Sequence, residues 1–370
     1  MKTNTITPNQ ITLFLIIYFF STFIGFFTVQ LINKAQYDSL LVICISGLVG
    51  CIYAFLCVKL ANRRPEEFIV YYGKEIFPNW IHLFLMGFIF FFCLHACSVV
   101  LKEYADFLIQ VYLPETPEWA IGTVFGIVIA ITARMGILTL FRAAQGLFYI
   151  ILLALLINGI FLGKELNFDR WIAFVTNHTL PGILKGSYFT TPFIGELGLF
   201  IFIFPFFMKK DKILKSMVWG IIFACFLIMT HIAQILLLFG PNLASHLSFP
   251  MLEIVRFIRI ADFIENLDPL LIAIWSTMVY LKISFFFYLS AFILAQIFRL
   301  KDHRPLTFSL AAITVVMSFR LSENAANLNF FMETTWPTFA YFAESIPILY
   351  LLMDTLRRFW KKKAIKKAES

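Results

Sequence analysis

The sequence predicts an all-α polytopic membrane protein with ten transmembrane helices. Of its 370 residues, 60% are hydrophobic and only 14% are charged, whereas soluble domains carry about 25% charged residues. Several apolar runs reach about 18 residues or more, which is the length that a helix needs to cross a membrane. Lysine and arginine are also distributed unevenly among the loops, as they are in membrane proteins.

Ten apolar stretches account for the predicted helices. Together they form one transmembrane domain over residues 1–370, which ends in a basic cytoplasmic tail, 357–370. The expected spans are 11–32, 39–60, 80–101, 117–134, 143–163, 190–208, 214–239, 267–297, 305–320 and 335–356.

The basic residues predict that both termini are cytoplasmic. With the N-terminus inside, 21 of the 30 Lys and Arg residues lie on that side and 8 on the other. Cytoplasmic loops carry such an excess. The net charge of +8 then reflects topology and attraction to anionic lipid headgroups, and no nucleic-acid partner is expected.

Two amphipathic segments indicate an internal repeat of five plus five spans, approximately 11–163 and 190–356. Pro65 opens a segment between spans two and three, and Pro250 opens one between spans seven and eight. In the second segment, Glu253, Arg256, Arg259, Asp262 and Glu265 recur every third residue. An odd number of spans per half inverts the second half, as in transporters whose site lies at the midplane where broken helices meet.

The first span of each half is expected to be the broken one. In span six, Gly195 and Gly198 flank Glu196, and glycines so close together favour an unwound stretch. In span one, Thr22 and Gly25 give a weaker signal. Helix ends exposed by such breaks attract carboxylate and ammonium groups, which suits a free amino acid.

Lys282 is an isolated charge in span eight, between Asp268 and Arg299. Intramembrane charges usually face the bundle interior and have a partner, and Glu196, which is also isolated, is the expected partner of Lys282. Lys282 is interpreted either as a structural cation that ties span eight to span one or six by hydrogen-bonding backbone carbonyls, or as a proton-coupling group. Glu196 is either satisfied by the unwound backbone or involved in ligand binding or gating.

Catalytic and metal-binding motifs are missing from the sequence. The six cysteines lie in apolar runs without a CxxC pair or a Cys/His ligand set. There is also no Walker loop, HExxH or GxSxG motif. We therefore expect no enzyme activity, no metal and no cofactor.

Residues 249–284 resemble a specific family. The matching residues are Phe249-Pro250, Leu252-Glu253, Arg256, Ile258, Asp262-Phe263, Glu265, Leu267-Asp268, Ile274-Trp275 and Lys282-Ile283-Ser284. Further matches are Arg134, Gly136, Arg142, Gly195-Glu196, Gly240-Pro241 and Trp336-Pro337. The sequence is similar to the spore germination permease family, the B subunits of nutrient germinant receptors. It departs from the family pattern at Ser21, Thr28 and Asn266.

The resemblance implies a fold like that of LeuT and the amino acid–polyamine–organocation transporters. It further implies a ligand-sensing subunit in the spore inner membrane, assembled with an A subunit and a lipoprotein C subunit. Binding of a small nutrient (an amino acid, sugar or nucleoside) would trigger germination.

The first hypothesis is a receptor that binds its nutrient between spans one, three, six and eight. The expected site consists of open backbone at Gly25, Gly195 and Gly198, polar contacts from Thr22, Glu196 and Ser284, walls from Leu197 and Tyr288, and a brace at Lys282. The second hypothesis is a secondary transporter that couples an amino acid to a proton or cation. A bilayer anchor without a pocket is a third, which leaves the isolated charges unexplained.

Overall fold

The structure is a computed structural model that describes residues 5–257, 268–322 and 324–368. Within these ranges the regular secondary structure is helical, apart from a single bridge between Ile6 and Phe207. Ile6 N donates to Phe206 O at 2.8 Å, and Met208 N donates to Ile6 O at 2.8 Å. The N-terminal segment is therefore held against the end of the sixth apolar stretch.

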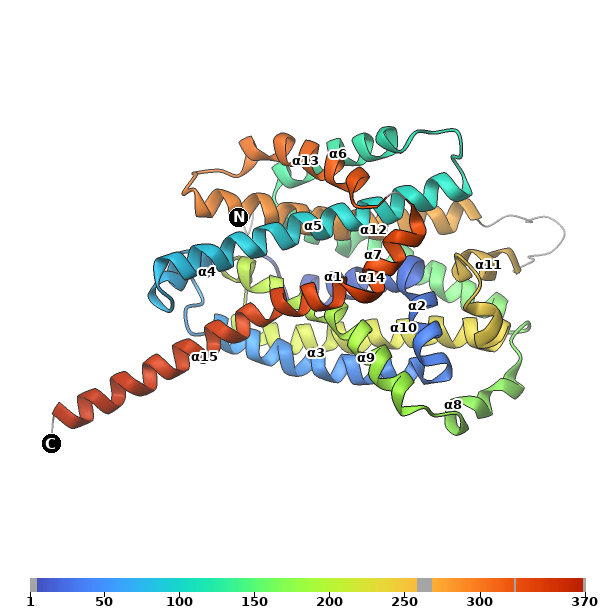
Figure 1. The fold of residues 1–370 in the computed structure, drawn as a ribbon, viewed down its shortest axis with the longest axis horizontal. Coiled ribbons are helices and arrows are strands. Elements are labelled where there is room, and N and C mark those ends of the chain that lie inside the picture. The colour runs from blue at the N-terminus through green and yellow to red at the C-terminus, as the bar shows by residue number, and fades with distance from the viewer. Residues whose placement is uncertain (1–4, 258–267, 323, 369–370) are drawn as a thin grey trace.

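The long helices run roughly side by side along the longest axis of the molecule (Figure 1). The α-helices of the first half, long and short, are α1 (Pro8–Thr22), α2 (Thr28–Ala35), α3 (Ser39–Ala61), α4 (Ile69–Tyr72), α5 (Asn79–Val111), α6 (Glu118–Met135) and α7 (Ile137–Leu162). In the second half they are α8 (Ala173–Thr176), α9 (Leu180–Gly195), α10 (Ile213–Ala244), α11 (Pro250–Phe257), α12 (Asp268–Ile297), α13 (Thr307–Arg320), α14 (Ala325–Thr334) and α15 (Trp336–Ala368).

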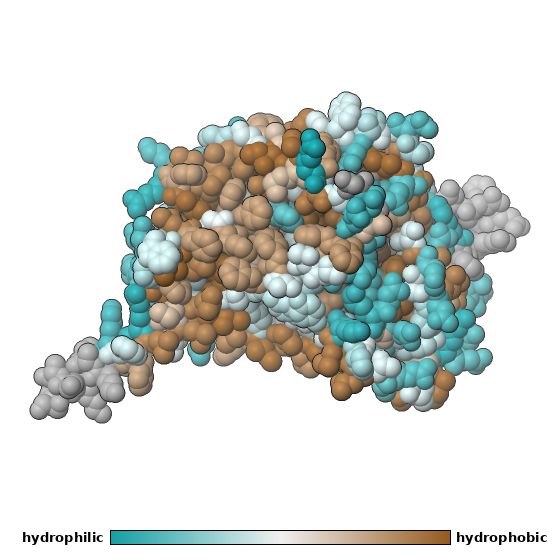
Figure 2. Space-filling view, viewed as in Figure 1, coloured by the Kyte–Doolittle hydropathy of each residue, from teal (hydrophilic) through white to brown (hydrophobic). Residues whose placement is uncertain are grey.

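Nine helical stretches in the described residues are long and apolar enough to cross a membrane. Hydrophobic residues form a broad band across the molecule, and hydrophilic residues gather at its two ends (Figure 2). The stretch expected at 305–320 corresponds to α13, which has only 14 residues where a span needs about 20. An all-α membrane protein is confirmed, and the count of ten spans stays a prediction.

Three of these stretches form the centre of the bundle. In the most apolar parts of α12 and of Leu180–Phe206, 83% of the residues are buried, and in Pro8–Gly25 78% are buried. In the most apolar part of α7 only 12% are buried. The α1 helix packs against α10, α7 and α12, and α12 packs against α5. Side chains that α1, α9 and α12 direct inward are thus kept away from lipid.

The two amphipathic segments lie at opposite ends of the bundle, with α4 at the end where the C-terminus extends and α11 at the other (Figure 1). We refer to these as the α4 end and the α11 end. The α11 helix begins at Pro250 as expected, whereas α4 begins at Ile69, later than Pro65. Opposite placement is what an inverted repeat requires. The charged positions 259, 262 and 265 lie outside the described residues.

The breaks expected in spans one and six are not confirmed as unwound stretches. Phe23–Phe27 forms a π-helical turn between α1 and α2, and Glu196–Phe206 forms a 3-10 helix directly after α9. A 3-10 helix rises about 2.0 Å per residue against about 1.5 Å in an α-helix. Helical geometry therefore changes at both expected positions while the chain remains helical.

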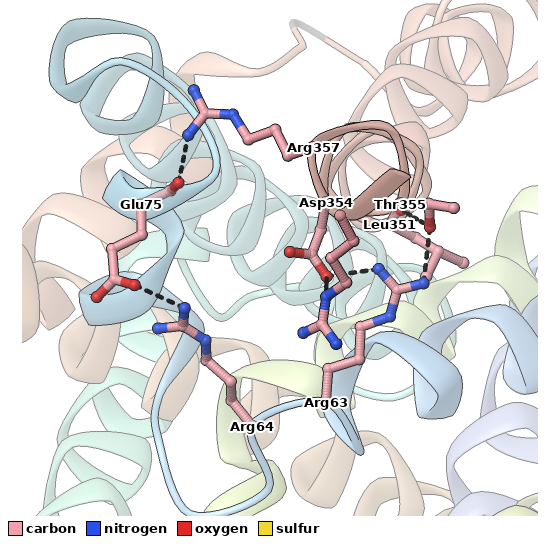
Figure 3. Close-up of polar contacts among 8 residues, drawn as sticks. Arg63, Arg64, Glu75, Leu351, Asp354, Thr355 and Arg357 are labelled. Atoms are coloured by element: carbon pink, nitrogen blue, oxygen red, sulfur yellow. Dashed lines mark hydrogen bonds and ion pairs between the residues drawn. The ribbon is translucent and has the colours of Figure 1, made fainter. Parts of the chain in front are cut away.

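A polar network at the α4 end fastens the α3–α4 loop to α15 (Figure 3). Arg63 donates to Asp354 Oδ2 at 2.5 Å and to Thr355 Oγ1 at 2.7 Å. Arg64 donates to Glu75 Oε2 at 2.6 Å. The Arg64 guanidinium holds the pKa of the exposed Glu75 carboxyl below its ordinary value. The network fixes the position at which α15 leaves the bundle.

A carboxylate at the α11 end clamps the start of α9 to the turn between α2 and α3. The buried Asp38 accepts from the Thr179 backbone N at 2.7 Å and lies 2.6 Å from His178 Nδ1. His178 is outside the membrane-spanning stretches, and its hydrogen bond to Asp38 raises the pKa of the imidazole. The clamp holds the chain where it enters the sixth stretch.

We expect the His178 contribution to stability to depend on pH. Because the folded-state pKa is raised, the contribution is fully present below the ordinary histidine pKa of about 6.5 and is lost as pH rises through the raised value. His178→Gln should lower the melting temperature at about pH 5.5 and leave it almost unchanged at about pH 9. A decrease of equal size at both pH values would contradict this account.

Candidate functional site

Lys282 is buried at the centre of the bundle and contacts two other elements. Its Nζ donates to Glu196 Oε2 at 2.8 Å and to Thr22 Oγ1 at 2.5 Å. Lys282 and Glu196 are each 2% exposed, and Thr22 is 3% exposed. The expected pairing of the two isolated charges is confirmed, and it joins α12, the 3-10 helix and the last residue of α1.

Aromatic rings complete the surroundings of the ammonium group. Lys282 Nζ lies 4.5 Å from the centroid of the Tyr18 ring and 5.7 Å from that of Phe286, within the range of a cation–π contact. The buried Tyr18 hydroxyl faces Glu196 but has no partner at hydrogen-bond geometry among the residues that the structure describes. Tyr18 was not among the predicted site residues, although it precedes Thr22 by one helical turn.

Lys282 and Glu196 are both buried, so each charged group needs the other as its counter-ion. Burial removes both groups from water, and the cost is offset only while geometry and hydrogen bonds are good. Each Lys282 contact goes to a side chain rather than to a backbone carbonyl. Lys282 does tie α12 to the first and sixth stretches, but through side chains where hydrogen bonds to backbone carbonyls were expected. A structural role and proton coupling both stay predictions.

Gly195 and Gly198 permit close packing where open backbone was expected. A Cβ atom on Gly195 would overlap the carboxylate of Glu344 on α15, and one on Gly198 would overlap the end of the Tyr53 side chain on α3. Tyr53 in turn donates to the backbone oxygen of Glu344 at 2.6 Å. The glycines therefore bring α3 and α15 against the sixth stretch at the level of Glu196.

Glu344 is a second acidic group near the pair and was not among the predicted site residues. Its Oε1 atom is buried and has no hydrogen-bond partner in the described part of the chain. The signal was available, because an acid flanked by apolar turns of an intramembrane helix is costly and hence commonly functional. The Glu344 carboxylate, on α15, contacts the sixth stretch at Gly195, next to Glu196.

Gly25 lies beneath the indole of Trp275, and a Cβ atom there would overlap the ring. Trp275 Nε1 donates to the backbone oxygen of Ser21 at 3.1 Å, next to the π-helical turn. The indole thus spans α12 and α1 about two turns from Lys282. Trp275 was quoted for the family resemblance but was not assigned to the site.

The remaining expected site residues do not join the Lys282 contacts. Ser284 is fully buried, but two residues along a helix turn its side chain about 200° from that of Lys282. Tyr288, on α12, stacks on Phe292 and lies edge-on to His303, which follows the end of α12. Leu197 is fully buried within the 3-10 helix. Ligand contacts by these three residues stay predictions.

The family model described as "Spore germination protein" matches residues 5–326 of the chain. This chain belongs to the spore germination protein family. It is 26% identical to spore germination protein XB of Bacillus anthracis over 265 residues, covering 70% of this chain and 72% of that protein. It is 21% identical to spore germination protein KB of Bacillus subtilis (strain 168) over 338 residues, covering 88% of each.

The fold of this spore germination permease is similar to that of a solved transporter. The structure of Mhp1, a nucleobase-cation-symport-1 family transporter in a closed conformation with bromovinylhydantoin bound, matches with a TM-score of 0.61 and 14% identity. The match covers 90% of this chain and 77% of Mhp1. The LeuT-like fold that the family resemblance implied is therefore confirmed, in a family of permeases rather than enzymes.

Proposed function

We propose that the chain is the ligand-sensing B subunit of a spore nutrient germinant receptor, with an amino acid as its nutrient. The observation that carries the proposal is the buried Lys282–Glu196 pair, which joins α12 to the 3-10 helix and hydrogen-bonds to α1. Membership of the spore germination protein family supports the germination role.

A zwitterion can exchange partners with this pair. The carboxylate of the amino acid would pair with the Lys282 ammonium group, and the ammonium group of the amino acid would pair with the Glu196 carboxylate. Neither buried charge then loses its counter-ion. The exchange separates α12 from the 3-10 helix by the width of the ligand. A ligand that binds the separated arrangement better than the paired one shifts the population toward it.

The proposal places the chain in the spore inner membrane with both termini in the cytoplasm. The α4 end then faces the cytoplasm and the α11 end faces outward, in a bundle of ten spans arranged as two inverted repeats. An A subunit and a lipoprotein C subunit complete the receptor and carry the signal onward. Attraction between the excess basic residues and anionic lipids supports this orientation.

The test combines binding, flux and germination. The purified chain in proteoliposomes is screened with the twenty amino acids by thermal shift, and the amino acid with the largest shift is then tested for uptake. We expect saturable binding without concentrative uptake. Spores that carry Glu196→Gln should fail to respond to that amino acid, because the carboxylate that takes its ammonium has gone.

The matched control is Glu67→Gln, since Glu67 is an exposed acid at the α4 end whose Arg64 contact is long, at 3.7 Å. Spores with this variant should germinate normally. If Glu196→Gln spores express the chain and germinate as well as the control spores, the site assignment is wrong.

A secondary transporter that couples an amino acid to a proton or cation is the alternative. The fold match to a cation symport family transporter favours it. Gradient-dependent, concentrative uptake by this chain alone would select the transporter over the receptor.

A further inference from the structure

A cavity of about 350 Å³ lies at the α11 end of the bundle. Its walls come from the π-helical turn and α2, from the last turns of α5, from residues 245–249 beyond the last turn of α10, and from α14. Most of the lining side chains are polar. Of the pair described above, neither Lys282 nor Glu196 lines the cavity, so it is a separate space that meets the expected site only at Gly25.

Three oxygen atoms on its lining residues are buried and have no hydrogen-bond partner in the described residues. They are Glu103 Oε2 and Asp106 Oδ2, which lie one turn apart on α5, and Gln30 Oε1 on α2. Glu103 is 8% exposed and Gln30 is 9% exposed. A buried acceptor without a partner is costly, so this cluster needs a donor.

The two neighbouring lysines, Lys102 and Lys34, already form ion pairs with other acidic groups than Glu103. Lys102 Nζ lies 3.0 Å from Asp106 Oδ1 and 2.9 Å from Glu118 Oε1. Lys34, on α2, pairs with Glu333 at 2.6 Å. Glu103 forms no ion pair with any residue that the structure describes. Among the described residues, Glu103 is therefore a cavity-lining carboxyl group without a cationic partner, beside the unpartnered acceptors of Asp106 and Gln30.

Gln30 has its orientation fixed by a second contact. Its Nε2 donates to Asn329 Oδ1 on α14 at 3.2 Å, which leaves its Oε1 as the free acceptor. An acceptor from an amide beside two carboxylates is not a set for a transition metal. The described residues contain no group of three His, Cys, Asp or Glu side chains that could hold a metal ion.

We propose that this cavity is a binding site for a primary organic ammonium group, separate from the Lys282–Glu196 pair. An ammonium group has three N–H donors, and Glu103, Asp106 and Gln30 offer three acceptors, two of them on carboxylates. Charge-assisted hydrogen bonds of this kind are about twice as strong as neutral ones. The volume is in the range that holds a small molecule, about 300 Å³ or more.

The experiment measures binding of L-alaninol, which has an ammonium group and no carboxylate, to the purified chain in nanodiscs at constant ionic strength. The uncharged analogue 1,2-propanediol is titrated in parallel. L-alaninol should bind saturably and 1,2-propanediol should not. Glu103→Gln and Gln30→Met, which act from two different helices, should each weaken L-alaninol binding, the first by about tenfold or more.

Two further variants separate this site from the rest of the protein. Glu118→Gln keeps the cavity wall and should leave L-alaninol affinity unchanged. Glu196→Gln, which tests the function proposed above, should also leave L-alaninol affinity unchanged. The failure of one proposal can therefore be distinguished from the failure of the other. The inference is overturned if L-alaninol does not saturate the wild-type chain, if both wall variants bind it normally, or if sodium chloride displaces it at equal concentration.

Discussion

Lys282→Met is expected to destabilise the folded protein by about 3–5 kcal/mol, because it leaves the Glu196 carboxylate buried without its cation. Glu196→Leu should cost a similar amount for the converse reason. The double variant should recover much of the loss, since an apolar pair of similar volume avoids the desolvation of both charges. Equilibrium unfolding of the four proteins in mixed micelles gives the coupling between the two side chains.

The control is a second lysine whose ion pair is more accessible. Lys34 pairs with Glu333, whose side chain is 32% exposed, so Lys34→Met should cost about 1 kcal/mol or less. If Lys282→Met costs no more than Lys34→Met, the central pair does not hold the bundle together in the manner described.

Gly25→Ala is expected to destabilise the folded protein, because its Cβ atom would overlap the rigid indole of Trp275. Overpacking of a well-packed core typically costs about 1–3 kcal/mol. Displacing the ring also breaks the bond from Trp275 Nε1 to Ser21 O. A lower melting temperature together with altered tryptophan fluorescence would report both effects.

Gly87→Ala provides the matched control, since Gly87 lies in the interior of α5 with nothing within 4 Å of its added Cβ atom. Alanine is the better helix former by about 1 kcal/mol, so this variant should be neutral or slightly more stable. In a Trp275→Leu background the cost of Gly25→Ala should nearly vanish. A cost that persists there would mean that another contact is responsible.

The apolar pattern predicted the helices well because length and hydrophobicity decide where a chain can cross a bilayer. The stretch expected at 39–60 is α3, Ser39–Ala61, and the one expected at 80–101 begins α5 at Asn79. The pairing of Lys282 with Glu196 was predictable for a related reason, since unpaired intramembrane charges are rare.

Local geometry was harder to predict than helix position. Glycines near Glu196 are compatible with an unwound stretch, with a 3-10 helix, or with close packing, and only the neighbours distinguish these cases. Those neighbours, Tyr53 and Glu344, come from helices far away in the sequence. The acceptor-lined cavity was missed because segments around residues 30, 103, 246 and 329 form it together.

The central claim is that an amino acid replaces each partner of the Lys282–Glu196 pair. It is tested most directly by measuring the coupling energy between these two side chains by a double-mutant cycle, first without ligand and then with a saturating concentration of the amino acid that gave the largest thermal shift. We expect a large coupling without ligand, which falls toward zero when the ligand is bound. A coupling that is the same in both conditions would contradict the exchange of partners.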